Sequence, residues 1–208
     1  MKRLSFDLHG TLVTYRHLDY FWMELIPRIY AEENGISLEN AKRKVYQLYE
    51  AVGPQDLRWY LPGYWISLLD LHVELSVLLE ECRRLVEPYP DAIEAVQQLK
   101  GKYRLVILTN ASSEFVELVL KEIAEFRDSF RAHYSSVTHF NLVQKTEEFY
   151  RRVLEAEGVS PAEFIHVGDD KVFDYEIPRR IGIAAYYIDR SSPSKALKNL
   201  EELVTMLK

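Results

Sequence analysis

The chain has 208 residues, of which 48% are hydrophobic and 28% charged, a composition typical of one or two globular domains rather than of a disordered or fibrous chain. Its 26 lysines and arginines against 32 aspartates and glutamates leave a formal net charge of −6, which argues against a dedicated binder of nucleic acid or of an anionic membrane. The single cysteine, Cys82, excludes an internal disulfide, and no cluster of cysteine and histidine has zinc spacing.

The chain opens with a predicted short strand over residues 3–8, which runs directly into a turn at His9-Gly10-Thr11. A glycine and a small hydroxyl residue at such a place mark the carboxyl end of a strand. An acidic residue already stands at Asp7, so the N-terminus lacks the apolar core of a signal peptide. No apolar run approaches the roughly 18 residues of a membrane span. We therefore expect a soluble, cytoplasmic protein.

A helical pattern follows over residues 15–86. Ser37 is the expected N-cap of a helix over 38–52, and a second long helix is expected over 64–86. The segment holds all three tryptophans, and its aromatic side chains are more typical of helix packing than of a substrate-binding platform. These aromatic residues are Tyr15, Tyr20, Trp22, Trp59, Tyr60 and Trp65.

From residue 87 onward, helical and strand patterns alternate. We expect helices over residues 92–101, 113–126, 146–157 and 193–207, and strands over 103–108, 134–137, 164–167 and 183–188, with a capping-box turn at 160–163. This alternation predicts an α/β protein with a parallel sheet covered on both faces, a Rossmann-like three-layer α/β/α core. The simplest organisation is a core of residues 1–14 and 87–208, interrupted by an all-helical insert over 15–86.

Polar residues gather where the predicted strands end, the place at which open parallel sheets carry their functional groups. The candidates are Asp7, His9, Thr109, Asn110, Lys145, Asp169, Asp170 and Asp174. Carboxylates are hard oxygen ligands that suit Mg²⁺, an aspartate can attack phosphorus, and a lysine neutralises a phosphoryl group. The set therefore indicates phosphoryl chemistry at one edge of the sheet.

Four segments in order resemble the motifs of the haloacid dehalogenase superfamily, most of whose members are phosphatases. They are FDLHGTL at 6–12, LVILTN at 105–110, Lys145, and HVGDD at 166–170 together with Asp174. Each is weak alone, but together they are highly specific, and the resemblance covers the whole chain outside the helical segment. It implies that the insert after the first motif is a cap domain.

The resemblance also implies roles. Asp7 would be the nucleophile that forms a covalent aspartyl intermediate. Thr109 and the backbone around Asn110 would bind the transferring group, and Lys145 would balance the charge of nucleophile and phosphoryl group.

The implied metal is Mg²⁺. Its ligands would be Asp7, the backbone carbonyl of His9 and Asp169. Asp170 and Asp174 are further candidates, which either bind the metal directly or support its ligands. His166, on a predicted buried strand, is expected to be a packed core residue.

His9 departs from the family pattern, because phosphatases of this family place a second aspartate there as general acid and base. Histidine can shuttle a proton, although a neutral ring beside Mg²⁺ and Lys145 is a base and a poorer acid. Metal-free dehalogenases of the family also lack this aspartate, but they lack the Gly-Asp-Asp run as well. The phosphonate-cleaving branch needs a lysine in the cap that forms a Schiff base, and no lysine of the helical segment is identified in that role.

The leading hypothesis is a Mg²⁺-dependent phosphatase acting on a small phosphorylated metabolite, with Asp7 as nucleophile and His9 as acid and base. One alternative is a carbon–halogen hydrolase of 2-haloacids. Another is a catalytically weakened member that binds a phosphorylated ligand or a partner protein. We expect no nucleic-acid or membrane partner, and a monomer or homodimer.

Overall fold

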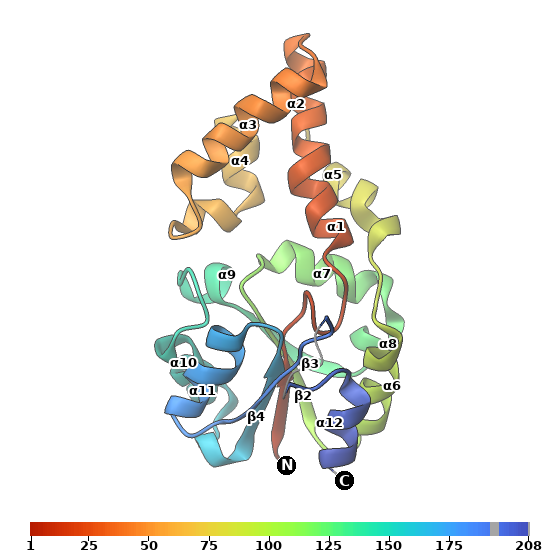
Figure 1. The fold of residues 1–208 in the computed structure, drawn as a ribbon, viewed down its shortest axis with the longest axis vertical. Coiled ribbons are helices and arrows are strands. Elements are labelled where there is room, and N and C mark those ends of the chain that lie inside the picture. The colour runs from red at the N-terminus through yellow and green to blue at the C-terminus, as the bar shows by residue number, and fades with distance from the viewer. Residues whose placement is uncertain (192–195, 208) are drawn as a thin grey trace. The chain divides into compact units, whose positions relative to one another are not determined.

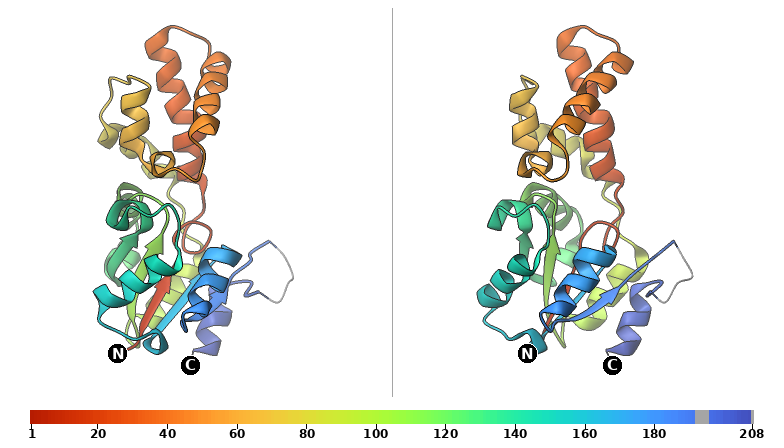
Figure 2. Two further views of the ribbon diagram at one scale, coloured as in Figure 1. Left: turned by 90° about the vertical axis from the view of Figure 1, so that its left-hand side faces the viewer. Right: turned by 60° about the vertical axis from the view of Figure 1, so that its left-hand side comes forward.

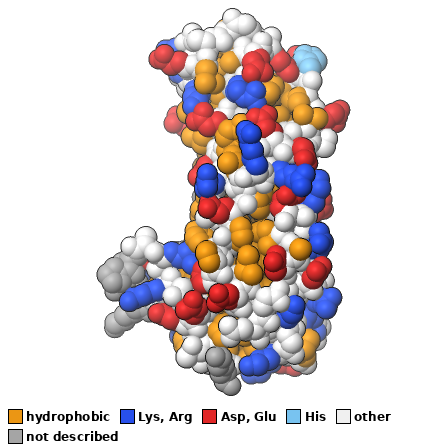
Figure 3. All heavy atoms as spheres, turned by 90° about the vertical axis from the view of Figure 1, so that its right-hand side faces the viewer, with side chains coloured by type: hydrophobic (Ala, Val, Ile, Leu, Met, Phe, Trp, Pro, Cys, Tyr) orange, Lys and Arg blue, Asp and Glu red, His pale blue; other side chains and the backbone are white. Residues whose placement is uncertain are grey.

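The computed structural model describes residues 1–191 and 196–207. The chain divides into two compact units, one formed by residues 1–14 with 88–208 and the other by residues 15–87. None of the helices in the described part is both long and apolar enough to cross a membrane. Acidic and basic side chains are interspersed over the face drawn in Figure 3.

The first unit contains a five-stranded sheet in the order β3-β2-β1-β4-β5, in which every neighbouring pair is parallel. The strands are β1 (Arg3–Phe6), β2 (Arg104–Thr109), β3 (Phe130–Ser135), β4 (Phe164–Gly168) and β5 (Ala184–Tyr187). β1 lies at the centre, and its last residue, Phe6, pairs with Ile107 on one side and with Val167 on the other. The carboxyl ends of β1, β2 and β4 therefore meet.

Helices cover both faces of this sheet (Figures 1 and 2). They are α6 (Pro90–Leu99), α7 (Ser113–Glu122), α8 (Ala124–Arg127), α9 (Ser136–Phe140), α10 (Glu147–Glu157), α11 (Ile177–Arg180) and α12 (Leu200–Met206), with a 3₁₀ turn η4 (Pro161–Glu163) and a π-helical turn η5 (Lys171–Glu176). In Figure 1, α6, α8 and α12 lie on one side of the sheet and α10 and α11 on the other. The predicted α/β fold with a parallel sheet is confirmed.

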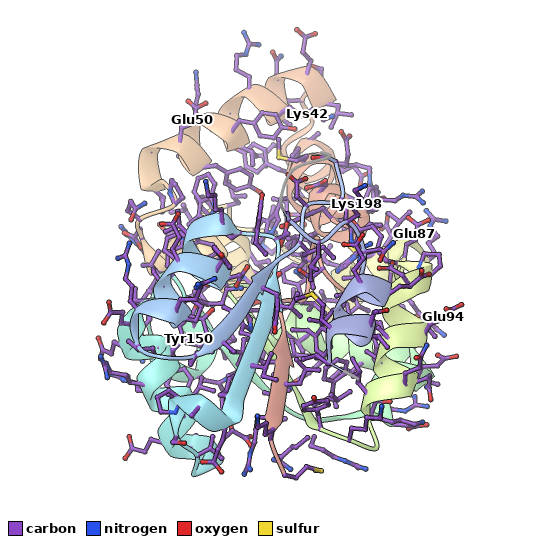
Figure 4. All side chains as sticks on the ribbon, turned by 60° about the horizontal axis from the view of Figure 1, so that its bottom comes forward. Lys42, Glu50, Glu87, Glu94, Tyr150 and Lys198 are labelled. Atoms are coloured by element: carbon purple, nitrogen blue, oxygen red, sulfur yellow. The ribbon has the colours of Figure 1, made fainter. Side chains whose placement is uncertain are left out.

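The helices bury the residues that their spacing predicts. On α6, Ala92, Val96 and Leu99 are buried, whereas Glu94 points to solvent (Figure 4). On the opposite face, Val153 of α10 packs in one cluster with Val106 of β2. Because such burial removes apolar surface from water, the two helical layers hold the sheet between them.

Three predicted elements in this unit differ from the structure by an interruption or by more than two residues. The predicted strand over 134–137 is instead the end of β3, because the Ser135 side chain accepts a hydrogen bond from the Thr138 N–H and starts α9. The predicted helix over 113–126 is interrupted at Ile123, whose backbone is extended. The last helix begins only at Leu200, where Asn199 is the N-cap, and residues 193–195 of the prediction lie outside the described residues.

The second unit is helical. It contains α1 (Arg16–Asp19), η1 (Tyr20–Leu25), α2 (Ile26–Asn34), α3 (Leu38–Val52), η2 (Leu57–Tyr60), α4 (Pro62–Leu68), α5 (Leu75–Cys82) and η3 (Arg83–Leu85). The predicted helix over 38–52 is confirmed, with Ser37 as its N-cap. The predicted single helix over 64–86 is wrong, because the chain turns at Asp70 (φ 52°) and buries Leu69 and Leu71 on either side of it.

The aromatic residues of the second unit form much of its interior. Trp65 is fully buried, and its ring centroid lies 4.5 Å from that of Tyr49. Tyr49 also contacts Trp22 and Trp59, with ring centroids 6.0 and 6.1 Å away. Edge-to-face pairs at these separations are favourable, so the three tryptophans pack the helices together, as expected. Tyr15 differs from the expectation, because it is exposed.

Candidate active site

The backbone brings Asp7 to the meeting point of three strand ends. Asp7 follows β1 directly, and its N–H donates to the Val167 carbonyl of β4 at 2.8 Å. Thr109 is the last residue of β2, and Gly168 is the last residue of β4, which leads into Asp169. The sheet order changes direction here, the usual position of a binding crevice in open parallel sheets.

Lys145 lies between two carboxylates of this edge. Its ammonium group forms ion pairs with Asp7 Oδ1 and, at 2.5 Å, with Asp174 Oδ1. The Lys145 side chain is only 2% exposed. Burial disfavours the charged ammonium, but the attraction of Asp174 and Asp7 outweighs it and holds the pKa of Lys145 above its usual range. Lys145 is therefore a fixed positive charge beside the Asp7 carboxylate.

Three carboxylates converge at this position. Asp7, Asp169 and Asp174 each offer an oxygen atom, and these atoms lie within 4.8 Å of one another. Burial, together with repulsion from Asp174 and Asp169, raises the pKa of Asp7 well above its usual value, although Lys145 opposes this. Burial also acts to raise the pKa of Asp174, but attraction to Lys145 and a hydrogen bond from His166 lower it to about 2.

This donor set fits Mg²⁺. Three carboxylates around one ammonium group leave an excess of negative charge, and hard oxygen atoms at this spacing are the ligands that Mg²⁺ prefers. A divalent cation would lower the free energy of the ionised carboxylates and so favour the charged form of Asp7.

Two glycines make room for the carboxylates. A Cβ atom on Gly10, whose φ is 82°, would lie 2.1 Å from Asp169 Oδ2. A Cβ atom on Gly168 would lie 2.4 Å from Asp174 Cγ. Any side chain at either position would displace an acidic group, so both glycines are required by the close approach of a carboxylate.

His166 fixes the orientation of Asp174. Its ring is buried in β4, with Nε2 at 2.9 Å from Asp174 Oδ1 and Nδ1 at 2.7 Å from Ser5 Oγ of β1. Burial lowers the pKa of His166, so we assign the neutral ring, which donates from Nε2 to the carboxylate and accepts at Nδ1 from the Ser5 hydroxyl. The ring of Tyr150 on α10 (Figure 4) packs 5.4 Å from the imidazole centroid. The predicted packed core histidine is thus also a hydrogen-bonding partner of the site.

Thr109 and Asn110 hold the neighbouring loops. Thr109 Oγ1 accepts from the Ala111 N–H at 3.1 Å. Asn110 Nδ2 donates to Gln144 Oε1 at 2.5 Å, and Asn110 Oδ1 accepts from Ser136 Oγ at 3.1 Å. Because Gln144 precedes Lys145, the Asn110 amide connects the end of β2 to the segment that carries the buried ammonium group.

The carboxylate of Asp170 accepts hydrogen bonds from backbone N–H groups. Its Oδ1 accepts from the N–H groups of Val172 and Phe173 at 2.8 Å and caps η5. Its own N–H donates to Asp174 Oδ2 at 3.1 Å. His9 lies in the loop after Asp7 and is 4% exposed. The structure therefore gathers Asp7, Lys145, Asp169 and Asp174, but not the Asp170 carboxylate.

Comparisons with known proteins relate the chain to a family of hydrolases. A sequence model of the haloacid dehalogenase-like hydrolases matches residues 1–182. The chain is 26% identical over 167 residues to the GMP/IMP nucleotidase YrfG of Escherichia coli strain K12, covering 79% of this chain and 72% of that protein.

Solved structures share the fold. A HAD phosphatase from Thermococcus onnurineus superposes with a TM-score of 0.84 at 24% identity, over 100% of this chain and 98% of that one. An L-2-haloacid dehalogenase from Xanthobacter autotrophicus superposes with a TM-score of 0.62 at 18% identity, over 100% and 98%. Since phosphatases and dehalogenases are both similar to this fold, the choice between them rests on the site itself.

Proposed function

Because the chain belongs to the haloacid dehalogenase-like hydrolases, we propose that it is a Mg²⁺-dependent phosphatase that acts on a small phosphorylated metabolite. The observation that carries the proposal is the buried Lys145 ammonium group between Asp7 and Asp174, with an oxygen of Asp169 within 4.8 Å of an oxygen of each of these carboxylates. A phosphate ester and the Asp7 carboxylate are both anions and approach each other only beside compensating positive charge.

The acidic surplus favours phosphate over haloacid chemistry. A 2-haloacid carries one carboxylate and needs no divalent cation, and three carboxylates around a single lysine would repel it. A divalent cation would neutralise this surplus, and a phosphate ester could then approach Asp7 with its oxygens beside the cation and Lys145. The dehalogenase alternative is thus the weaker candidate on electrostatic grounds.

Asp7, Asp169 and Asp174 would hold Mg²⁺, which supplies positive charge to the phosphoryl oxygens. In the first step, an Asp7 carboxylate oxygen attacks phosphorus, the ester P–O bond breaks, and the departing oxygen takes a proton. In the second step, water attacks the phosphorus of the aspartyl phosphate and loses a proton. The bond between phosphorus and the Asp7 oxygen then breaks, which releases inorganic phosphate.

Other residues of the chain support these steps. Lys145 holds its charge beside the nucleophile, and Thr109 with the backbone around Asn110 would bind the phosphoryl oxygens. His9 in its protonated form would give a proton to the departing oxygen, and the neutral ring left behind would accept one from the attacking water. The helical unit over residues 15–87 would act as the cap that selects the substrate and excludes bulk water.

A purine nucleoside monophosphate is the substrate to test first, since a relative is named a GMP/IMP nucleotidase. The chemistry itself is best tested with p-nitrophenyl phosphate and acetyl phosphate, because a good leaving group hardly needs a general acid. We expect hydrolysis of both with Mg²⁺, loss of hydrolysis in Asp7→Asn, and a larger rate on GMP or IMP in His9→Asp.

The proposal fails if the purified protein with Mg²⁺ hydrolyses neither model substrate and Asp7→Asn behaves like the parent. Halide release from a 2-haloacid that a chelator does not affect would establish the dehalogenase instead. Tight binding of a phosphorylated metabolite without turnover, unchanged by His9→Asp, would establish a catalytically weakened binder.

A further inference from the structure

Arg190 joins segments far apart in the sequence, just beyond the end of β5. Its Nη2 donates to the Thr11 carbonyl at 2.8 Å, and its Nε donates to the Gly10 carbonyl at 3.3 Å. Its Nη1 lies 3.0 Å from both carboxylate oxygens of Asp91. The guanidinium carbon lies 3.8 Å from the centroid of the Tyr89 ring. We call this set of contacts the Arg190 clamp.

The geometry of the Arg190 clamp requires a guanidinium group. The side chains of Arg190 and Asp91 are only 18% and 12% exposed, so the pair is largely removed from solvent. A planar fork can stack on Tyr89 while it donates in several directions within its plane, and a lysine ammonium group cannot do both. For comparison, Arg179 also lies over a ring, that of Tyr175 at 4.7 Å, but in an exposed position.

The Arg190 clamp acts on the loop that follows the candidate nucleophile. Within this loop, the N–H groups of Leu12 and Val13 donate to the Leu8 carbonyl at 2.9 and 3.0 Å, and the Gly10 N–H donates to the Val13 carbonyl at 2.8 Å. Arg190 therefore holds the outer carbonyls of a turn whose inner hydrogen bonds are already satisfied.

Gly10 connects this loop to the acidic cluster. The Asp169 carboxylate packs so closely on the Gly10 Cα that a Cβ atom there would be 2.1 Å from Asp169 Oδ2. A shift of Gly10 outward would leave the carboxylate without this contact, and a shift inward would displace it. A displacement of Gly10 would therefore change the space available to the Asp169 carboxylate.

The Arg190 clamp also fixes the segment that returns from the helical unit. The Tyr89 N–H donates to the Leu12 carbonyl at 3.0 Å, and Val13 forms an antiparallel bridge with Pro88. Asp91 Oδ2 accepts from the Leu200 N–H at 2.7 Å at the start of α12. Both segments that connect the two units are thus anchored at one place within the first unit.

We propose that Arg190, held by Asp91 and Tyr89, is a positioning residue of the active site. It fixes the loop over residues 8–13, and through Gly10 it sets the position of Asp169 and the affinity of the acidic cluster for a divalent cation. The second part rests on the proposed function, whereas the first part does not.

The experiment compares the parent with Arg190→Ala, Arg190→Lys and the matched control Arg179→Ala. Amide hydrogen exchange of residues 8–13 without metal tests the first part, and calorimetric titration with Mg²⁺ tests the second. For both Arg190 variants we expect faster exchange in this loop and Mg²⁺ binding weaker by about 10- to 100-fold, the range for lost support of metal ligands. For Arg190→Ala, millimolar guanidinium chloride should recover part of both, and Arg179→Ala should match the parent.

Each outcome decides the proposal. Unchanged exchange of residues 8–13 in Arg190→Ala overturns it. Faster exchange with Mg²⁺ affinity within twofold of the parent also overturns it, because the clamp would then serve stability alone, and thermal unfolding measured in parallel would show that loss. If the parent itself binds no Mg²⁺, the proposed metal-dependent function fails, while the exchange experiment still decides whether Arg190 fixes the loop.

Discussion

A single methyl group at Gly10 should weaken Mg²⁺ binding strongly while the protein still folds. In Gly10→Ala, the new Cβ would lie 2.1 Å from Asp169 Oδ2, about 0.9 Å inside the 3.0 Å limit that real Cβ contacts respect. The Asp169 carboxylate is the end of a side chain and can move away from the new methyl group, so the protein should still fold. The left-handed φ of 82° adds a backbone cost of about 1–2 kcal/mol for an alanine.

This movement of the Asp169 carboxylate should impair metal binding. Ligand distances in a functional metal site hold to within about 0.2 Å, and Mg²⁺ demands near-ideal octahedral geometry. A carboxylate displaced by about 0.9 Å exceeds that tolerance several times. We expect Mg²⁺ affinity to fall by about 10- to 100-fold, measured by calorimetric titration and by the Mg²⁺ dependence of p-nitrophenyl phosphate hydrolysis.

Gly158→Ala is the matched control. Gly158 has a φ of 63°, so an alanine there meets similar backbone strain, but nothing lies within 4 Å of its Cβ position. Both variants should lose similar stability in urea denaturation, and only Gly10→Ala should lose Mg²⁺ affinity. If Gly10→Ala binds Mg²⁺ as tightly as Gly158→Ala, then Asp169 is not positioned by this contact and the reasoning is refuted.

Three further perturbations test the polar groups. Lys145→Met removes the ammonium group that two buried carboxylates share, so the free energy of unfolding without metal should fall by about 3–5 kcal/mol in urea denaturation, and a loss below about 1 kcal/mol would contradict this. His166→Gln loosens Asp174 and should weaken Mg²⁺ binding about tenfold, whereas unchanged binding would make the imidazole only a packing group. Glu157→Gln should cost about 1–3 kcal/mol at pH 7, because this carboxylate accepts from two arginines and a tyrosine, and exposed Glu155→Gln on the same helix should cost nothing measurable. Burial acts to raise the pKa of Glu157, but these partners lower it below the usual 4.5. Its contribution to stability is therefore fully present above pH 4.5 and decreases as the pH falls below that value; a Glu157→Gln deficit that grows below pH 4.5 would contradict this.

The strand-end candidates could be predicted from the sequence because parallel strands impose their geometry. Once β1, β2 and β4 are recognised, their carboxyl ends must meet, and Asp7, Thr109 and Asp169 must lie near one another. The fold class followed in the same way from alternating helix and strand patterns. Accordingly, Asp7, Asn110 and Asp169 stand directly after a strand, and Thr109 is the last residue of β2.

Partners distant in the sequence were missed. Nothing in the apolar run of β4 distinguishes His166 from a packed core residue, and its hydrogen bond to Ser5 spans 161 positions. Arg190 and Asp91 are 99 positions apart and belong to no recognisable motif. The only sequence signal was the residue type, because a buried histidine or arginine needs polar partners.

By itself, the sequence determined that this chain is an α/β hydrolase, and it identified Asp7 as the first of the acidic candidate residues. Hydrophobic period and motif order are properties of the linear chain, so they can be recognised without a structure. Only the tertiary structure decided what the later aspartates do. Asp170 caps the next helical turn, Asp169 packs on Gly10, and Asp174 meets Lys145 and His166. The direction of a side chain after a strand depends on the backbone of its turn and on the groups that fill the space around it, and both are set by packing between distant segments.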